Sequence, residues 1–110
     1  MPDTTPIAIT ARELAQRLTT DTPPVVVDVR EPAERQAACL PGTLHIPLRE
    51  LPARLGELDL NAEIVVHCHH GIRSMQAVQF LRAEGYARAQ NLTGGIAAWS
   101  REVDPTVPEY

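Results

Sequence analysis

The sequence of 110 residues contains no lysine, and all ten of its basic residues are arginines. Its 14 acidic residues give a formal net charge of −4, and the arginines form no basic run. Proteins that bind nucleic acids or acidic membranes usually gather basic residues on one surface. We therefore expect neither nucleic acid nor a membrane as a partner, and any site for an anion must be local.

Long apolar stretches are missing too. No segment approaches the roughly 20 apolar residues that span a bilayer, and residues 1–10 lack the basic and apolar regions of a secretion signal. Repeats and low-complexity segments are absent, while 44% of the residues are apolar and 22% are charged, as in ordinary globular domains. We expect a cytoplasmic protein with one domain over residues 1–110 and loose termini at 1–5 and 104–110.

Cysteine is scarce, with only Cys39 and Cys68 in the chain. Nothing indicates an oxidising compartment, so we expect two free thiols and interpret Cys39 as a packing residue. His67, His69 and His70 surround Cys68, but no Cys-x-x-Cys or His-x-x-x-His spacing completes a metal site, and consecutive side chains point in different directions. We therefore predict no metal and no cofactor.

Short strands and helices alternate along the chain, which predicts an α/β sheet covered by helices on both faces. The predicted strands are 7–9, 25–29, 44–46, 64–66 and 89–92, and the predicted helices are 10 to about 19, 32–37, 51–58, 73–84 and one that carries Trp99. Thr10 and Glu13 form a capping box, Trp99 is interpreted as a core residue, and Thr93-Gly94-Gly95 as a tight turn into the last helix. Ligands of such sheets bind at the carboxyl ends of the strands.

One segment combines a strand, a cysteine and the start of a helix. The apolar residues 64–66 predict a buried strand, Cys68 follows at the turn, and helical spacing begins near Arg73. Free N–H groups and the dipole at the amino end of a helix favour a thiolate or a bound anion. Gly71 allows the turn to curl until these N–H groups converge on the sulfur, and Arg73 adds a fork suited to oxyanions.

Each of these residues by itself has a simpler explanation. A lone cysteine is usually a small buried hydrophobe, and a lone arginine is usually solvated. The strand, Cys68, Gly71, Arg73 and the helix in direct succession are much harder to explain in that way. We therefore predict a cysteine nucleophile inside an anion-binding loop.

Four segments span most of the chain, namely Asp28–Glu34, Leu40–Leu48, Cys68–Ser74 and Asn91–Trp99. In their order and spacing they resemble the single-domain rhodanese-like sulfurtransferases. The resemblance implies a five-stranded, mostly parallel sheet with helices on both faces. It also implies that Cys68 takes a sulfane sulfur from thiosulfate or from a persulfide or polysulfide, holds it as a persulfide, and passes it to cyanide or a thiol.

The resemblance also assigns the site residues. Cys68 is the catalytic residue, and the remainder of its loop is expected to bind the substrate, namely His69, His70, Gly71, Ile72, Arg73 and Ser74. Asp28 and Arg30, at the end of the second strand, are supporting residues that either reach this loop or pair with Glu34, and we favour the structural role. The expected partners are a small sulfur-containing anion or persulfide donor and, as a further possibility, a protein sulfur donor or acceptor.

The chain departs from the family pattern at two places. Cys39 stands where the family often has histidine, so a second sulfur-carrying thiol is the alternative to its packing role. His69 and His70 occupy positions that hold permanent cations in some thiosulfate-specific members, and histidine is largely neutral at pH 7. A persulfide or polysulfide donor is therefore favoured over the dianion thiosulfate.

Two other functions compete with the sulfurtransferase. Related folds place a cysteine and an arginine around an oxyanion in phosphatases and arsenate reductases, but four residues separate Cys68 from Arg73 and those loops typically have one more. The second alternative is a sulfur carrier or interaction module that receives a persulfide from a desulfurase and passes it to a partner.

Overall fold

The computed structural model describes residues 5–109, and five strands form one sheet in the order β1-β5-β4-β2-β3. All adjacent pairs are parallel, so the expected five-stranded sheet is confirmed and is parallel throughout rather than mostly so. β4 is the central strand. The strands are β1 (Ala8–Ile9), β2 (Val25–Asp28), β3 (Leu44–His45), β4 (Ile64–His67) and β5 (Ala89–Leu92).

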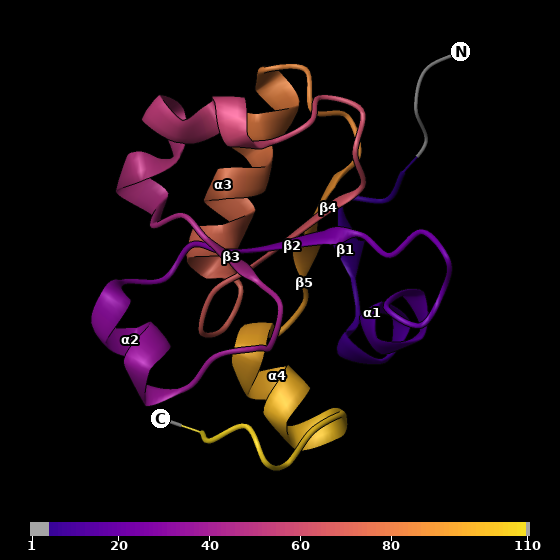
Figure 1. Ribbon diagram of the computed structural model, residues 1–110, viewed down its shortest axis with the longest axis vertical. Helices are drawn as coiled ribbons and strands as arrows, with labels where there is room; N and C mark the ends of the chain where they lie inside the picture. Colours follow the sequence, from indigo (N-terminus) through magenta and orange to yellow (C-terminus); the bar gives the residue numbers. More distant parts are fainter. Residues whose placement is uncertain (1–4, 110) are drawn as a thin grey trace.

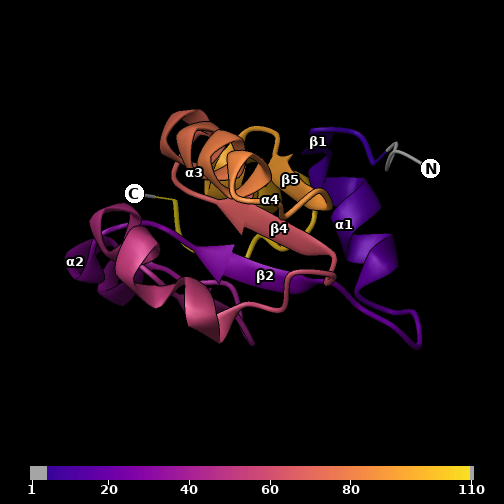
Figure 2. The same ribbon diagram turned by 90° about the horizontal axis from the view of Figure 1, so that it is seen from above.

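Helices cover both faces of the sheet, as the alternation of elements predicted. In Figure 1, α3 lies above the strands and α4 below them, and Figure 2 shows the same layers from above. One apolar core joins the sheet to α3 and η1, and the other joins it to α1 and α4. The helices are α1 (Ala11–Arg17), α2 (Pro32–Ala37), the 3-10 helix η1 (Leu48–Glu57), α3 (Ile72–Ala83) and α4 (Gly95–Glu102).

The register of the sheet brings the carboxyl ends of three strands together. Val66 of β4 pairs with Asn91 of β5, and His67 pairs with Asp28 of β2. Residues 64–67 of β4 are all fully buried, as expected for a central parallel strand. Cys68 leaves β4 at this edge, with Asp28 on one side and Asn91 on the other.

Local signals in the sequence set several helix boundaries. Thr10 caps α1, and the reciprocal hydrogen bonds with Glu13 form the predicted capping box. The helix ends at Arg17 rather than near Thr19, with Leu18 as its C-cap. The helix predicted over 51–58 is η1, a 3-10 helix that begins earlier; Pro52 within it has no N–H to continue an α-helical ladder.

Val107 and Cys39 lie differently from what the sequence indicates. Val107, within the segment 104–110 that was expected to be loose, is buried in the core with Trp99, and its carbonyl accepts a 2.5 Å hydrogen bond from Ser100 Oγ. Residues 1–4 and 110 lie outside the described residues. Cys39 is exposed rather than packed, since it alternates with buried Ala38 and Leu40 in an extended segment. Within residues 5–109, no helix is long and apolar enough to cross a bilayer.

His67 adds a pH-sensitive group to the core. It is fully buried, and burial lowers its pKa from the ordinary value of 6.5 to about 4, against the opposing influence of the Asp28 charge. A histidine that is neutral in the fold but protonated in the unfolded chain destabilises the fold as the pH falls. Its neutral form is therefore part of the native core at pH 7.

We predict that His67→Gln weakens the pH dependence of stability. The folded pKa is depressed, so the contribution of His67 is complete above the unfolded pKa and is lost as the pH falls from about 6.5 to about 4, by up to about 3 kcal/mol. Urea unfolding at pH 7 and pH 4.5 measures this loss. His70→Gln, which changes an exposed histidine in the same way, is the control and should keep the pH dependence of wild type. If the stability of His67→Gln depended on pH as strongly as that of wild type, the prediction would be contradicted.

Candidate active site

The sulfur of Cys68 lies inside a loop of backbone N–H groups. Gly71 N–H donates to Sγ at 3.1 Å and Ser74 N–H at 3.4 Å, and Cys68 is only 1% exposed. Gly71 is the N-cap of α3 and has a φ of +112°, a left-handed conformation that glycine adopts readily. The predicted convergence of N–H groups on the sulfur is confirmed.

These contacts favour the thiolate. Burial raises the pKa of the Cys68 thiol. Hydrogen bonds from the Ser74 side chain and from the backbone of Ser74, Gly71 and Arg73 lower the pKa, and their combined effect outweighs burial. The pKa therefore lies below its ordinary value. A thiolate is the form that attacks a sulfur donor. The loop therefore stabilises the charged form of the Cys68 sulfur relative to the neutral thiol.

A second helix supports the loop from the other side. Ile96 N–H at the start of α4 donates to Cys68 O at 2.9 Å, and Ala97 N–H donates to His69 O at 3.2 Å. Gly95 makes this approach possible, because a Cβ there would lie 2.5 Å from Cys68 O, and its φ is +61°. The tight turn predicted at residues 93–95 is present, and it also brings α4 against the loop, which the sequence analysis missed.

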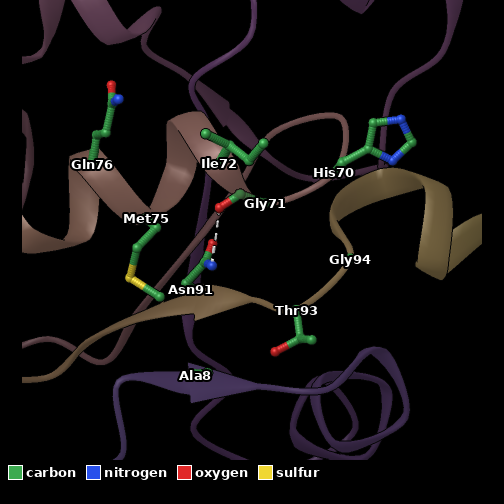
Figure 3. A pocket seen from close by; sticks show the side chains of 9 residues that line it. All are labelled: Ala8, His70, Gly71, Ile72, Met75, Gln76, Asn91, Thr93 and Gly94. Carbon is green, nitrogen blue, oxygen red and sulfur yellow. Dashed lines mark hydrogen bonds between the residues drawn. The ribbon is translucent and has the colours of Figure 1, made fainter.

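Asn91 is a further residue that the sequence analysis missed, although it begins one of the four segments that resemble the family. Its Oδ1 accepts a 2.5 Å hydrogen bond from Ser74 Oγ, and its Nδ2 donates to Gly71 O at 3.1 Å (Figure 3). Ser74 Oγ also lies 3.3 Å from Cys68 Sγ, so its single proton serves either Asn91 or the sulfur. Asn91 thus holds Gly71 and Ser74, whose N–H groups donate to the sulfur.

Arg73 is held by Glu34. Its Nη1 and Nη2 donate to Glu34 Oε1 and Oε2 at 2.6 and 2.8 Å, a bidentate pair between α3 and α2. The guanidinium group that could bind an oxyanion is therefore bound to a carboxylate of the same chain, that of Glu34. Glu34 belongs to the segment 28–34 that resembles the family, but no local pattern connects it with Arg73, 39 positions away.

Asp28 and Arg30 form a buried pair behind α2. Arg30 is fully buried and donates from Nε to Asp28 Oδ1 at 2.9 Å and from Nη2 to Oδ2 at 2.8 Å. Arg30 also donates to the backbone carbonyls of Ala38 at 2.7 Å and of Glu34 at 3.3 Å. Burial raises the pKa of Asp28, but the hydrogen bonds and charges of its neighbours, Arg30 first among them, lower it overall. This geometry fits the favoured structural role, since the pair anchors the backbone of α2.

His69 and His70 stack on each other with their ring centroids 4.0 Å apart. His69 is partly buried, and burial together with the neighbouring His70 lowers its pKa below the ordinary value. His69 is therefore neutral at pH 7 and supplies no permanent positive charge beside Arg73.

A pocket of about 510 Å³ lies beside the loop, between α3 and the strands β5 and β1 (Figure 3). His70, Gly71 and Ile72 line it, whereas Cys68, His69, Arg73 and Ser74 do not. Gly71 therefore belongs to both places, since its N–H group donates to the sulfur and its backbone lines this pocket. Among residues 5–109, no group of three or more His, Cys, Asp or Glu side chains is placed to hold a metal ion.

Comparison with known proteins shows the family of this chain. Residues 10–102 match the Rhodanese-like domain family. The chain belongs to this family. The rhodanese-like chain is 38% identical to a sulfurtransferase of Allochromatium vinosum over 90% of its own length and 92% of that protein. Together these matches place it among the rhodanese-like sulfurtransferases.

Two further relatives widen the comparison. The human single-domain sulfurtransferase TSTD1 has a TM-score of 0.79 and 30% identity, with 88% of this rhodanese-like chain and 97% of that chain covered. The putative sulfur carrier protein YrkF of Bacillus subtilis is 33% identical over 87% of this chain, which spans about half of YrkF, 52% of its length. The rhodanese-like unit therefore occurs both alone and within longer proteins.

We predict that Gly95→Ala destabilises this rhodanese-like domain. The added Cβ would overlap the carbonyls of Cys68 and His69, and the positive φ would strain alanine, a cost of about 2 kcal/mol or more. Urea unfolding measures the change. Gly56→Ala is the matched control, since a Cβ there meets nothing within 4 Å, and it should be nearly neutral; equal effects of the two would contradict the close approach of α4.

We also predict that Ser74→Ala raises the pKa of Cys68. In a Cys39→Ser background, the rate of Cys68 alkylation by iodoacetamide follows the thiolate, so the midpoint of its pH profile should lie below the ordinary thiol value of 9.0. Loss of the Ser74 hydroxyl should move the midpoint upward, because the hydrogen bond from this side chain lowers the pKa of Cys68. Ser100→Ala, at a buried serine bonded to Val107 O, should leave it in place. An unshifted midpoint in Ser74→Ala would remove this hydroxyl from the stabilisation of the thiolate.

Proposed function

We propose that the protein transfers a sulfane sulfur through a persulfide on Cys68. The observation that carries this proposal is the buried Sγ with its N–H donors from Gly71 and Ser74, at the amino end of α3. Few roles other than nucleophilic chemistry explain a sulfur held as an anion in this way.

The transfer proceeds in two displacements. The Cys68 thiolate attacks the outer sulfur of the donor, a new S–S bond forms, and the old bond to that sulfur breaks with its electron pair leaving on sulfite or on a thiolate. The acceptor, cyanide or a thiolate, then attacks the same outer sulfur and releases the Cys68 thiolate. Each intermediate at this position carries one negative charge, so the N–H groups of Gly71 and Ser74 stabilise thiolate and persulfide alike.

A persulfide or polysulfide is proposed as the donor in preference to thiosulfate. The neutral His69 supports this choice, because it adds no charge to attract a dianion. The donor and acceptor are small molecules or the persulfide of a partner protein. We also retain a cytoplasmic location as a proposal, since the mechanism needs a reduced Cys68.

A sulfur carrier is the second candidate function. The relative YrkF is named a putative sulfur carrier protein, and Ile72 at the rim of the loop is 75% exposed, where a partner would meet it. The phosphatase hypothesis is less favoured, because the loop N–H groups donate to the sulfur itself. A phosphatase needs these donors farther apart, around a tetrahedral phosphate.

The test is mass spectrometry after incubation with a polysulfide and, separately, with thiosulfate. Wild type and Cys39→Ser should gain one sulfur on Cys68, and Cys68→Ser should gain none at that position. Thiocyanate formation from added cyanide should follow the same pattern. Its rate should fall on the order of 1,000-fold or more in Cys68→Ser, as expected when a nucleophile is removed.

The outcomes separate the candidate functions. Persulfide formation without turnover on cyanide or small thiols would favour the carrier. Equal losses in Cys39→Ser and Cys68→Ser would contradict a single-cysteine mechanism. Hydrolysis of aryl phosphates by wild type but not by Cys68→Ser would overturn the sulfurtransferase in favour of a phosphatase.

A further inference from the structure

Glu34 is a charged residue that contacts the loop 68–74 through Arg73 but takes no part in the sulfur transfer described above. Its two carboxylate oxygens accept hydrogen bonds from both terminal nitrogens of Arg73, at 2.6 and 2.8 Å. The side chain of Glu34 is 22% exposed and that of Arg73 36%, so the pair is partly shielded from water. A bidentate pair of this kind is stronger and more specific than a single surface contact.

The carboxylate is held in place before it meets Arg73. Glu34 Oε1 also accepts from Glu31 N–H at 3.1 Å, within the capping box of α2. The backbone of α2 is anchored in turn by the fully buried Arg30, which donates to the carbonyls of Glu34 and Ala38. The position of Glu34 therefore follows from the fold, and Arg73 meets a preorganised negative charge.

The pair changes the charge that a donor meets. Arg73 lies between Gly71 and Ser74, whose N–H groups reach the sulfur, so its guanidinium is the permanent positive charge of the loop. Glu34 balances that charge, and His69 beside them is neutral at pH 7. The backbone N–H groups can hold one negative charge on sulfur, but a second charge on the donor gains little from the compensated Arg73 and is repelled by Glu34.

We propose that Glu34 is a specificity-determining residue that, by pairing with Arg73, disfavours doubly charged donors such as thiosulfate and favours donors with a single charge on the transferred sulfur. The inference rests on the proposed sulfur transfer and assigns the donor class to a residue outside the loop. A purely positioning role for Glu34 gives the opposite result, because loss of the pair would then misplace Arg73 and slow both donors.

The test compares two donors in wild type and Glu34→Gln, a variant that keeps the size of the side chain and one acceptor oxygen but removes the charge and the bidentate acceptance from Arg73. The donors are thiosulfate and 2-hydroxyethyl persulfide, whose one charge lies on its terminal sulfur. Glu34→Gln should raise kcat/KM for thiosulfate by about tenfold, chiefly through a lower KM, and should change the value for the persulfide far less. The gain should shrink as the ionic strength rises.

Two variants serve as controls. Glu31→Gln removes the same charge from the start of the same helix, where Glu31 pairs with exposed Arg49, and should leave the preference between donors as in wild type. In the double variant Glu34→Gln, Arg73→Gln the thiosulfate gain should vanish, because it depends on a released Arg73. Urea unfolding checks that each variant folds.

The results distinguish this inference from the proposed function. If Cys68 of wild type takes sulfur from neither donor, the sulfur transfer itself fails. If wild type takes sulfur but Glu34→Gln loses activity equally with both donors, or shows an unchanged preference, Glu34 does not set the donor class and the inference is overturned. An equally large gain for thiosulfate in Glu31→Gln would also overturn it, because loss of any negative charge near the start of α2 would then explain the effect.

Discussion

The hydrogen bonds from Gly71 and Ser74 to Cys68 Sγ are the contacts on which the site depends. A sulfur that is 1% exposed loses its water, and a thiolate there is tolerable only because N–H donors replace that water. These donors are available because α3 starts at this point, and they converge because Gly71 adopts a φ of +112°. The buried parallel sheet around β4 keeps this geometry rigid.

The loop is supported by contacts that reach it from three other elements. α4 donates two backbone N–H groups to its carbonyls, Asn91 of β5 bridges Gly71 and Ser74, and Glu34 of α2 holds Arg73. The support for α2 comes in turn from the buried pair of Asp28 and Arg30. The N–H groups of Gly71 and Ser74 stabilise the charge on the sulfur, whereas Glu34 balances the charge of Arg73. These contacts are separate, so one can change without the other.

Much of the fold could be predicted because its signals are local. The apolar run of β2, the capping box of Thr10 and Glu13, and the apolar strand before Cys68 each specify an element within a few residues. The predictions were less accurate where tertiary packing decides, as in the extent and 3-10 geometry of η1, the anchored Val107 and the exposed Cys39. The sequence shows that such residues are apolar or small, but not which neighbours they meet.

The loop of N–H groups around the Cys68 sulfur could be predicted from the sequence alone, because residues 68–74 are contiguous and the turn, the glycine and the helix start act over that short range. Tertiary structure decided the partners of the loop. Glu34 and Arg73 are 39 positions apart and Ser74 and Asn91 are 17 apart, so their contacts depend on the strand order β5-β4-β2 and on where α2 is anchored. No local preference encodes those pairings. They form because the parallel sheet brings the carboxyl ends of its strands to one edge, where side chains remote in the sequence surround the same sulfur.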